Sequence, residues 1–354
     1  MAEQMDMQQI DGADVFRWFV SGAREVAAHM KYLNIINVFP VADGDTGTNL
    51  TATLRAMVEK PMQTPSFNKM LQQFSQSALE SARGNSGIIF ASYINGLAME
   101  STPYDKVDVK EFATVASGAV RHLYNAVEYP REGTIMSVIR DWAEFLNRNT
   151  ERFRGFPELF EAAYHVATEA LEKTKTQLAV LRKNNVVDSG AAGFVRFLEG
   201  INRAFGEGRS QDVIEDFTPV TFVPDTEATE YRYCTEALLD TAANLVTNDV
   251  IASIKPILHP LGDSLIITPR DHRLKIHIHT NHPELVMSRL RPYGTILEQK
   301  ADDMALQNRL RLLPKGGVGL ITDSIADLPD SFLLEHAISV VPLGVIVQET
   351  PYLD

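Results

Sequence analysis

Cysteine, positive charge and long apolar runs are all scarce in this sequence, and each deficit excludes a class of protein. Cys234 is the single cysteine among 354 residues, so no internal disulfide can form and we expect a reducing, cytoplasmic location. The net charge of −13 argues against nucleic acid as a partner. Because no apolar run is long enough to cross a bilayer, we also expect no membrane span.

Two well-known nucleotide-binding motifs are missing as well. The sequence contains neither a Walker A motif nor the glycine-rich fingerprint of a Rossmann fold. A bound nucleotide would therefore be held in another way, and its phosphates would need a metal, backbone amides or a placed arginine beside so acidic a chain. Hydrophobic residues make up 45% of the chain, which suits a globular protein of two or three domains.

Apolar residues recur at helical spacing through the first two hundred residues. Within 15–32, for example, Val15, Phe19 and Val26 fall on one helical face. Helices are predicted at 15–32, 48–60, 68–82, 86–99, 109–127, 134–146, 158–181 and 189–205. The short connections between them would make neighbouring helices antiparallel, so we predict an all-α domain over residues 1–207.

The character of the sequence changes after residue 207. Residues 208–230 contain Asp, Pro and Thr without helical periodicity and are predicted to be a linker. Strands are predicted at 231–236, 263–269 and 274–280, and a helix at 283–291. These elements predict a small α+β domain over residues 231–314.

A third pattern begins at residue 315. Residues 318–322 and 339–347 predict two strands, with a helix between them at 330–336. A strand, a helix and a second strand cannot bury both faces of a sheet alone. We therefore expect residues 315–354 to be the start of a truncated α/β domain.

The most informative motif is Pro-Val-Ala-Asp-Gly-Asp-Thr-Gly-Thr-Asn, which ends at residue 49. Asp43 and Asp45 place two carboxylates within three residues, hinged by Gly44. Mg²⁺ prefers hard oxygen ligands and is usually held by one or two carboxylates together with phosphate and water. We predict that Asp43 and Asp45 are catalytic Mg²⁺ ligands and that Asn37 adds an amide oxygen.

A helix is expected to begin directly after these carboxylates. Thr46 stands at the expected N-cap, and the amides of Gly47, Thr48 and Asn49 would then point at an anion, assisted by the helix dipole. Metal ions that bridge phosphates beside such amides are the general arrangement for phosphoryl transfer. The alternatives are an acidic turn before a capped helix, or a calcium loop. The EF-hand pattern fails, because no further ligands and no terminal Glu follow at the required spacing.

Two further turns rich in small residues also precede predicted helices. The first consists of Arg83, Gly84, Asn85, Ser86 and Gly87. The second consists of Asp188, Ser189 and Gly190. We expect Ser86 to cap the first helix and the small residues to let phosphate approach the backbone, whereas Asp188 alone is as well explained by capping. Three such helix starts in one domain favour a phosphate site, in which Arg83 is a candidate contact or an ordinary surface arginine.

Four motifs in order resemble the DhaL-type (DAK2) kinase domain of bacterial fatty acid kinases. They are Pro-Val-x-Asp-Gly-Asp-Thr-Gly-Thr-Asn, Ala-Arg-Gly-Asn-Ser-Gly, Glu-Gly-Thr at 132–134 and Val-Val-Asp-Ser-Gly-Ala. The resemblance covers residues 12–205 and implies an antiparallel helical barrel related to the nucleotide domain of dihydroxyacetone kinases. It implies ATP and Mg²⁺ as cofactors, with the metal on Asp43 and Asp45. Ala42 stands where a proline is usual, which removes no ligand.

Two histidines share one face of a predicted strand in the second domain. His277 and His279 lie two residues apart, so both imidazoles point the same way, and Cys234 is able to complete a three-ligand zinc site. The plainer alternative is a buried free cysteine. Segments around these residues resemble the middle domain of the same kinases, which favours Zn²⁺ and implies self-association as a homodimer. Whether the metal is catalytic, structural or an aid to docking stays open.

The last segment resembles the start of a DegV-type fatty-acid-binding protein. The resemblance rests on Ile-Thr-Asp-Ser-Ile-Ala-Asp-Leu-Pro at 321–329, Val-Pro-Leu at 341–343 and Tyr-x-Asp at 352–354, although Ile325 replaces the usual Thr or Ser. Such a domain carries a fatty acid and presents its carboxylate. As a partner it would be fused to the kinase or separate from it, and fusion would raise the effective concentration of the acceptor.

These resemblances together predict a phosphotransferase that converts a carrier-bound fatty acid into an acyl phosphate. Residues 46–49 and 84–87 would hold the ATP phosphates, and residues 188–190 would border the nucleotide. A carboxylate is already ionised at neutral pH, so positioning and charge neutralisation would supply most of the catalysis. The alternatives are a dihydroxyacetone-type kinase acting on a small polyol and a non-catalytic nucleotide-binding regulator.

Overall fold

The computed structural model divides the chain into two compact units. The first comprises Met1–Pro40 and Asp45–Asp225, and the second comprises Val41–Gly44 and Thr226–Asp354. The described residues are 7–206, 230–241, 248–312, 318–336, 338–341, 343–347 and 350–353. The predicted linker at 208–230 therefore lies, except for its last residue, outside the described residues.

The first unit is helical, as predicted. Its helices are α1 (Gly12–Ala28), α2 (Met30–Ile35), α3 (Thr46–Glu59), α4 (Phe67–Ser81), α5 (Gly84–Glu100), α6 (Val109–Ala126), α7 (Ile135–Asn149), α8 (Phe156–Gln177), α9 (Ala179–Asn184) and α10 (Ser189–Phe205). Two predicted helices are each divided, one at His29 and the other at Leu178, whose extended backbone separates α8 from α9. A short antiparallel pair, β1 (Gln9–Ile10) with β2 (Val107–Asp108), was not predicted.

Carboxylates fix the starts of several of these helices. Asp11 and Asp14 form a capping box at α1, and Asp108 and Glu111 form another at α6. In each box two orphan backbone N–H groups are satisfied reciprocally. No helix in the described part of the chain is both long and apolar enough to cross a lipid bilayer.

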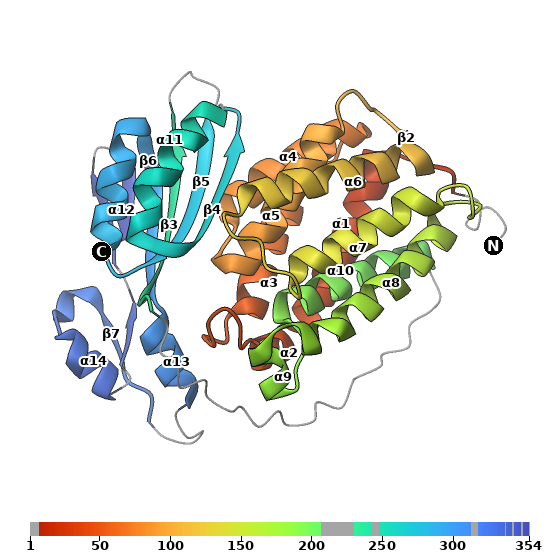
Figure 1. The fold of residues 1–354 in the computed structure, drawn as a ribbon. Coiled ribbons are helices and arrows are strands. Elements are labelled where there is room, and N and C mark those ends of the chain that lie inside the picture. Colours follow the sequence, from red (N-terminus) through yellow and green to blue (C-terminus); the bar gives the residue numbers. More distant parts are fainter. Residues whose placement is uncertain are drawn as a thin grey trace. The chain divides into compact units, whose positions relative to one another are not determined.

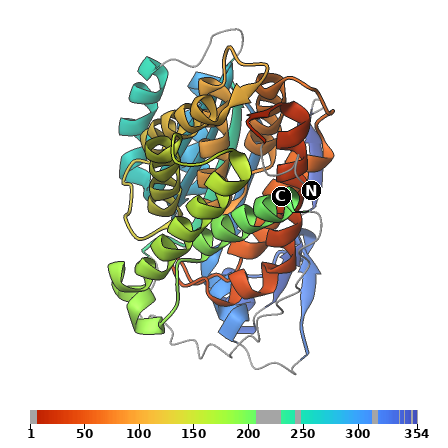
Figure 2. The same cartoon turned by 90° about the vertical axis from the view of Figure 1, so that its right-hand side faces the viewer.

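The helices of the first unit pack in a closed ring (Figures 1 and 2). Contacts run from α4 to α5, α6, α7 and α8, continue to α10 and α1, and return to α4. Trp18 lies at the centre of the core, with its ring centroid 5.1–6.1 Å from those of Phe112, Phe156, Phe160 and Phe205. This ring agrees with the predicted helical barrel.

The second unit is built on a four-stranded antiparallel sheet in the order β4-β5-β3-β6. The strands are β3 (Tyr233–Asp240), β4 (Gly262–Arg270), β5 (Arg273–Thr280) and β6 (Thr295–Asp303). The helices are α11 (Asn248–Leu258), α12 (Pro283–Leu290) and α13 (Met304–Leu312), with single turns η1 (His259–Leu261) and η2 (Arg291–Tyr293). One sheet face, with Leu239, Ile267 and Ile276, packs on α11 and α12 in an apolar core. Three strands and α12 confirm the predicted α+β character, whereas α11, β6 and α13 were missed.

The last part of the second unit forms a strand–helix–strand motif. Strand β7 (Ile321–Asp323) pairs in parallel with β8 (Ser339–Val341), and η3 (Ser324–Ala326) and α14 (Asp330–His336) lie between them in sequence. The predicted strand at 339–347 is wrong as one element, because β8 is followed by β9 (Gly344–Val347), which pairs with β10 (Thr350–Leu353). Val318 and Ile321 are 92% and 74% exposed, as expected for a sheet with an uncovered face.

Candidate functional site

The acidic turn before α3 is held in place by the buried side chain of Asn37. Its Oδ1 accepts the backbone N–H groups of Asp45 and Thr46, both at 3.1 Å. A carbonyl oxygen has two lone pairs, and these two bonds use both. The predicted metal ligand Asn37 therefore fixes the turn in this structure, and Asp43 with Asp45 remains as the predicted carboxylate pair.

Gly44 separates these two carboxylates with a φ of +73°, a conformation that favours glycine. Both aspartates are partly exposed. Asp45, and not Thr46, is the N-cap of α3, and its side chain makes no capping hydrogen bond. The prediction that Thr46 caps the helix is wrong by one residue, because the backbone is already helical at Thr46.

Two of the α3 amides that were predicted to face an anion are bonded within the protein. Thr48 N–H donates to Asn34 Oδ1 at 3.1 Å, and Asn49 N–H donates to the carbonyl oxygen of Asp45 at 2.9 Å. Gly47 has a packing role, since a Cβ there would lie 2.1 Å from the carbonyl oxygen of Met30. Sequence reasoning missed Asn34, which no spacing rule connects with Thr48.

Three glycine-rich turns come together at the starts of α3, α5 and α10. A Cβ at Gly84 would lie 2.4 Å from Asn49 Nδ2, so α5 begins against α3. A Cβ at Gly190 would lie 2.7 Å from Ser86 Oγ, so α10 begins against α5. In this structure the glycines therefore allow the helix starts to approach one another. Polar atoms of Asn49 and Ser86 lie where the three starts meet.

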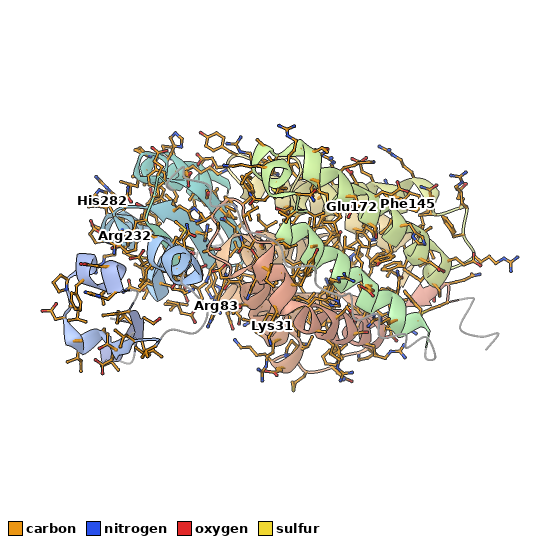
Figure 3. The ribbon with its side chains drawn as sticks, turned by 90° about the horizontal axis from the view of Figure 1, so that it is seen from below. Lys31, Arg83, Phe145, Glu172, Arg232 and His282 are labelled. Carbon is orange, nitrogen blue, oxygen red and sulfur yellow. The ribbon has the colours of Figure 1, made fainter. Side chains whose placement is uncertain are left out.

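The start of α5 differs from the prediction. Arg83 is the N-cap and makes no side-chain capping bond, whereas Ser86 lies inside the first turn. Gly84, the first helical residue, has a φ of +61°, which explains why a glycine stands there. Arg83 is exposed at this helix start (Figure 3). Its guanidinium is therefore accessible to an anion at the same end of the helix.

Asp188 joins the starts of two helices. Its Oδ1 accepts the N–H of Ala191 at 2.8 Å, which caps α10, and the N–H of Ile135 at 3.0 Å, at the start of α7. Its own N–H donates to Thr174 Oγ1, and Ser189 Oγ donates to the carbonyl oxygen of Leu33. Burial raises the pKa of Asp188 to about 6, although both backbone bonds oppose this. The capping alternative is thus the role that the structure assigns to Asp188.

Cys234, His277 and His279 converge on one face of the second unit's sheet. Cys234 stands opposite His279 in the β3–β5 register, and the donor atoms of all three residues lie within 4.8 Å of one another. All three are buried, and they form the one three-donor group of His, Cys, Asp or Glu found among the described residues. His282 lies outside the group and faces Glu284.

This donor set fits zinc, which favours thiolate and imidazole ligands. His277 Nε2 is buried without a hydrogen-bond partner among the described residues, which is unusual for a ring nitrogen and is explained by a metal. Burial, with His277 as a lesser cause, lowers the pKa of His279 to about 3. His279 is therefore neutral near pH 7, which is the form that binds metals.

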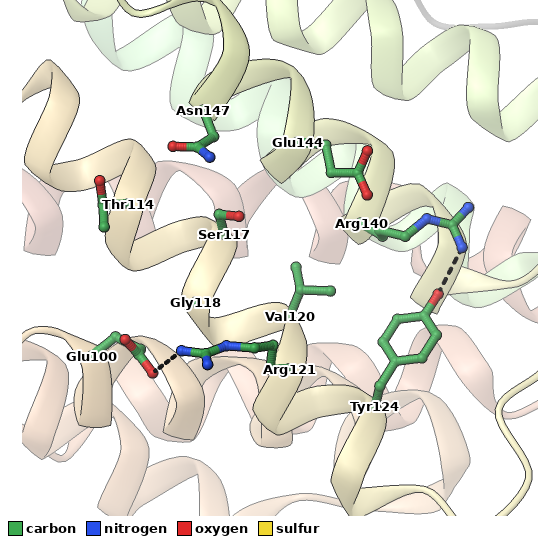
Figure 4. Close-up of a pocket in the computed structure, with 10 residues that line it drawn as sticks. All are labelled: Glu100, Thr114, Ser117, Gly118, Val120, Arg121, Tyr124, Arg140, Glu144 and Asn147. Carbon is green, nitrogen blue, oxygen red and sulfur yellow. Dashed lines mark hydrogen bonds and ion pairs between the residues drawn. The ribbon is translucent and has the colours of Figure 1, made fainter.

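A separate pocket of about 500 Å³ lies against α5, α6 and α7 (Figure 4). Its lining residues are Glu100, Thr114, Ser117, Gly118, Val120, Arg121, Tyr124, Arg140, Glu144 and Asn147. Arg140 is bonded to Glu132 at 2.7 Å and to Asp141 at 2.9 Å, and Arg121 pairs with Glu100. The cations of this pocket already have anionic partners, so it offers phosphate little. No sequence motif marks it, because its residues are spread over helix faces.

Two protein-family models match the chain in succession. Residues 40–203 match the DAK2 domain, and residues 230–311 match the FakA-like middle domain of fatty acid kinase. The first match contains all three glycine-rich turns, and the second contains Cys234, His277 and His279.

Similar proteins occur in staphylococci. Uncharacterized proteins of Staphylococcus saprophyticus and Staphylococcus epidermidis (strain ATCC 12228) are 30% identical over 315 and 318 residues, and each match covers 86% of this chain. This chain spans 57% of the length of these relatives.

Among solved structures, the dihydroxyacetone kinase from C. freundii in complex with AMP-PNP and Mg²⁺ aligns with a TM-score of 0.42 at 16% identity, over 56% of this chain and 35% of that chain. Its native form aligns with a TM-score of 0.41 at 15% identity, over 56% and 36%. From the family-model matches, the chain contains a DAK2 domain followed by a FakA-like middle domain of fatty acid kinase.

Proposed function

We propose that this chain is an ATP-dependent phosphotransferase whose nucleotide phosphates bind at the joined starts of α3, α5 and α10. The observation that carries the proposal is the close approach of these starts, 2.4 Å between a Cβ at Gly84 and Asn49 Nδ2. Helix N-termini attract phosphate because their unpaired amides and dipoles are positive there. The DAK2 match at 40–203 supports the same assignment. The proposed nucleotide site consists of residues 46–49, 84–87 and 188–190.

Mg²⁺ is the proposed metal of this site, and it would offset phosphate charge beside an acidic chain. Asp43 and Asp45 would hold it, since they offer hard oxygens on an exposed turn. Asn49 Nδ2 and Ser86 Oγ would orient the phosphates as hydrogen-bond donors. Arg83 would add a positive charge at the start of α5.

The proposed acceptor is the carboxylate of a fatty acid. The match to the FakA-like middle domain of fatty acid kinase at 230–311 supports this choice. A DegV-type carrier would present the fatty acid, and the strand–helix–strand motif that contains β7 and β8 is the proposed start of such a domain. A cytoplasmic location and a homodimer complete the proposal.

The middle domain is proposed to bind Zn²⁺ through Cys234, His277 and His279. The support is the donor set, in which ligand atoms lie within 4.8 Å of one another, and the orphaned Nε2 of His277. Bound zinc would hold β3 and β5 together at this point, and it would add a Lewis acid to this face of the sheet. Their burial keeps the imidazoles from exchanging freely with water.

An acceptor assay tests the proposed reaction. The purified protein is incubated with ATP and Mg²⁺ and with either a fatty-acid-loaded DegV-type carrier or dihydroxyacetone, and ADP release is measured. We expect ADP release with the loaded carrier and little release with dihydroxyacetone. Release with dihydroxyacetone alone would favour a polyol kinase. ATP binding without turnover under any condition would favour a nucleotide-binding regulator.

A further inference from the structure

The second unit's sheet has one apolar face and one buried polar face. Successive residues of a strand point to opposite faces, so Ala237 and Leu239 join the apolar core while Cys234 and Glu236 point the other way. Glu236 is only 2% exposed. A buried carboxylate is costly unless it is paired, so its partners indicate what it does.

Glu236 stands between a lysine and a histidine that both come from β5. Its Oε2 lies 3.3 Å from Lys275 Nζ, and its Oε1 lies 3.7 Å from His277 Nδ1. In the sheet register Glu236 is directly opposite His277 on one side and Lys300 on the other. The side chains of Lys275 and His277 are 6% and 0% exposed. The three residues thus form a buried row that ends at a proposed zinc ligand.

The direction of this row settles the roles of the two ring nitrogens of His277. A carboxylate facing Nδ1 favours the tautomer in which Nδ1 carries the proton. The lone pair is then on Nε2, which is the buried nitrogen that has no partner among the described residues. Carboxylates that accept from one ring nitrogen of a metal-bound histidine orient the ring and make it a better ligand.

We infer that Glu236, held by Lys275, is a positioning residue that orients His277 toward the metal bound by Cys234, His277 and His279. This inference rests on the proposed zinc site and goes beyond its three ligands. Lys275 keeps the carboxylate charged and fixed in a buried place, and Glu236 transmits this position to the imidazole. The row is therefore part of the metal site and not an isolated ion pair of the sheet.

Metal affinity tests the inference without reference to catalysis. The whole chain is titrated with Zn²⁺ against a chromophoric chelator, and with Co²⁺, whose thiolate charge-transfer and d–d bands report the cysteine ligand and the coordination geometry. We expect Glu236→Gln to weaken Zn²⁺ binding by about 10- to 100-fold and to alter the Co²⁺ d–d bands. The charge-transfer band should persist once the site is saturated, because Cys234 is unchanged.

Asp240→Asn is the matched control. Asp240 lies on the same strand two turns of the pleat away, and its carboxylate is 3.7 Å from His272 Nε2, outside the metal cluster. Its substitution should leave Zn²⁺ affinity unchanged. The double variant Glu236→Gln with Lys275→Met removes both buried charges together, so it should fold even if one single variant does not.

The outcomes separate this inference from the proposal beneath it. If wild-type protein binds zinc and both Glu236→Gln and the double variant bind it equally tightly, Glu236 has no positioning role. If wild-type protein binds no Zn²⁺ or Co²⁺, the proposed metal site itself is wrong and the row is only structural. Weakened binding in Glu236→Gln together with unchanged binding in Asp240→Asn supports the inference.

Discussion

The Oδ1 atom of Asp188 accepts the backbone N–H of Ile135 at 3.0 Å, across 53 residues of sequence. The same oxygen caps its own helix through Ala191, so one buried carboxylate fixes the starts of α7 and α10. Gly190, two residues further on, lies against Ser86 of α5. Asp188 therefore connects the Glu-Gly-Thr motif before α7 to the proposed phosphate site.

Removing this shared cap should destabilise the protein more than removing an ordinary one. Asp188→Ala leaves two buried N–H groups without an acceptor, and we expect a loss of about 2–4 kcal/mol in the free energy of unfolding. Asp108→Ala, which removes the side-chain cap of α6 alone, should cost about 1 kcal/mol. Urea denaturation measures both. Equal losses would show that the bond to Ile135 contributes nothing.

The pH dependence of stability should reveal the burial of Asp188. Its pKa is raised from 3.8 to about 6, so the folded state binds the proton more tightly than the unfolded state. The resulting contribution is complete below pH 3.8 and is lost as the pH rises through 6, a change of about 3 kcal/mol. Asp188→Asn keeps an acceptor oxygen without a charge. Relative to this variant, the wild type should become less stable between pH 4 and pH 7, and a constant difference would refute the shift.

A methyl group at Gly84 should disrupt the meeting of α3 and α5. The φ of +61° is strained for alanine, and the new Cβ would lie 2.4 Å from Asn49 Nδ2. We expect Gly84→Ala to cost about 1–3 kcal/mol of stability and to weaken binding of Mg²⁺·AMP-PNP by about 10-fold or more, measured by titration calorimetry. Gly206→Ala is the control, because no atom lies within 4 Å of a Cβ there. Unchanged nucleotide binding in Gly84→Ala would place the nucleotide elsewhere.

Zinc content should depend on the three converging residues of the second unit. We expect wild-type protein to carry about one zinc ion per chain by elemental analysis, and Cys234→Ala, His277→Ala and His279→Ala to carry little. His282→Ala should retain zinc, because His282 is exposed and faces Glu284. Zinc retained by all three cluster variants would contradict the site.

The helical part of the fold was predictable because amphipathic periodicity marks every long helix of the ring. The break at Leu178 was not, because nothing in the local sequence opposes a continuous helix there and its extended backbone is visible only in the structure. Strand β6 was missed for a different reason. As an edge strand it is half-exposed along most of its length, so it shows no clear alternation of buried and exposed residues.

The candidate site was predictable in its motifs but not in its hydrogen bonds. The Asp-Gly-Asp turn and the glycine-rich turns are visible in sequence, and the structure brings the glycine-rich turns together. The tasks of Asn34 and Asn37 depend on where α2 and α3 meet, which sequence spacing does not give. Both predicted caps, Thr46 and Ser86, were misplaced because the backbone turns helical earlier than the side-chain preference suggests.

The most direct test of the account is the affinity of the protein for Mg²⁺·AMP-PNP when each carboxylate of the acidic turn is neutralised. Asp43→Asn and Asp45→Asn change one charge each, and Asp105→Asn makes the same change at an exposed position away from this turn. We predict that wild type and Asp105→Asn bind the nucleotide equally, and that each turn variant loses at least about 10-fold in Mg²⁺-dependent affinity. Equal binding by all four proteins would contradict the assignment of Asp43 and Asp45 to the metal.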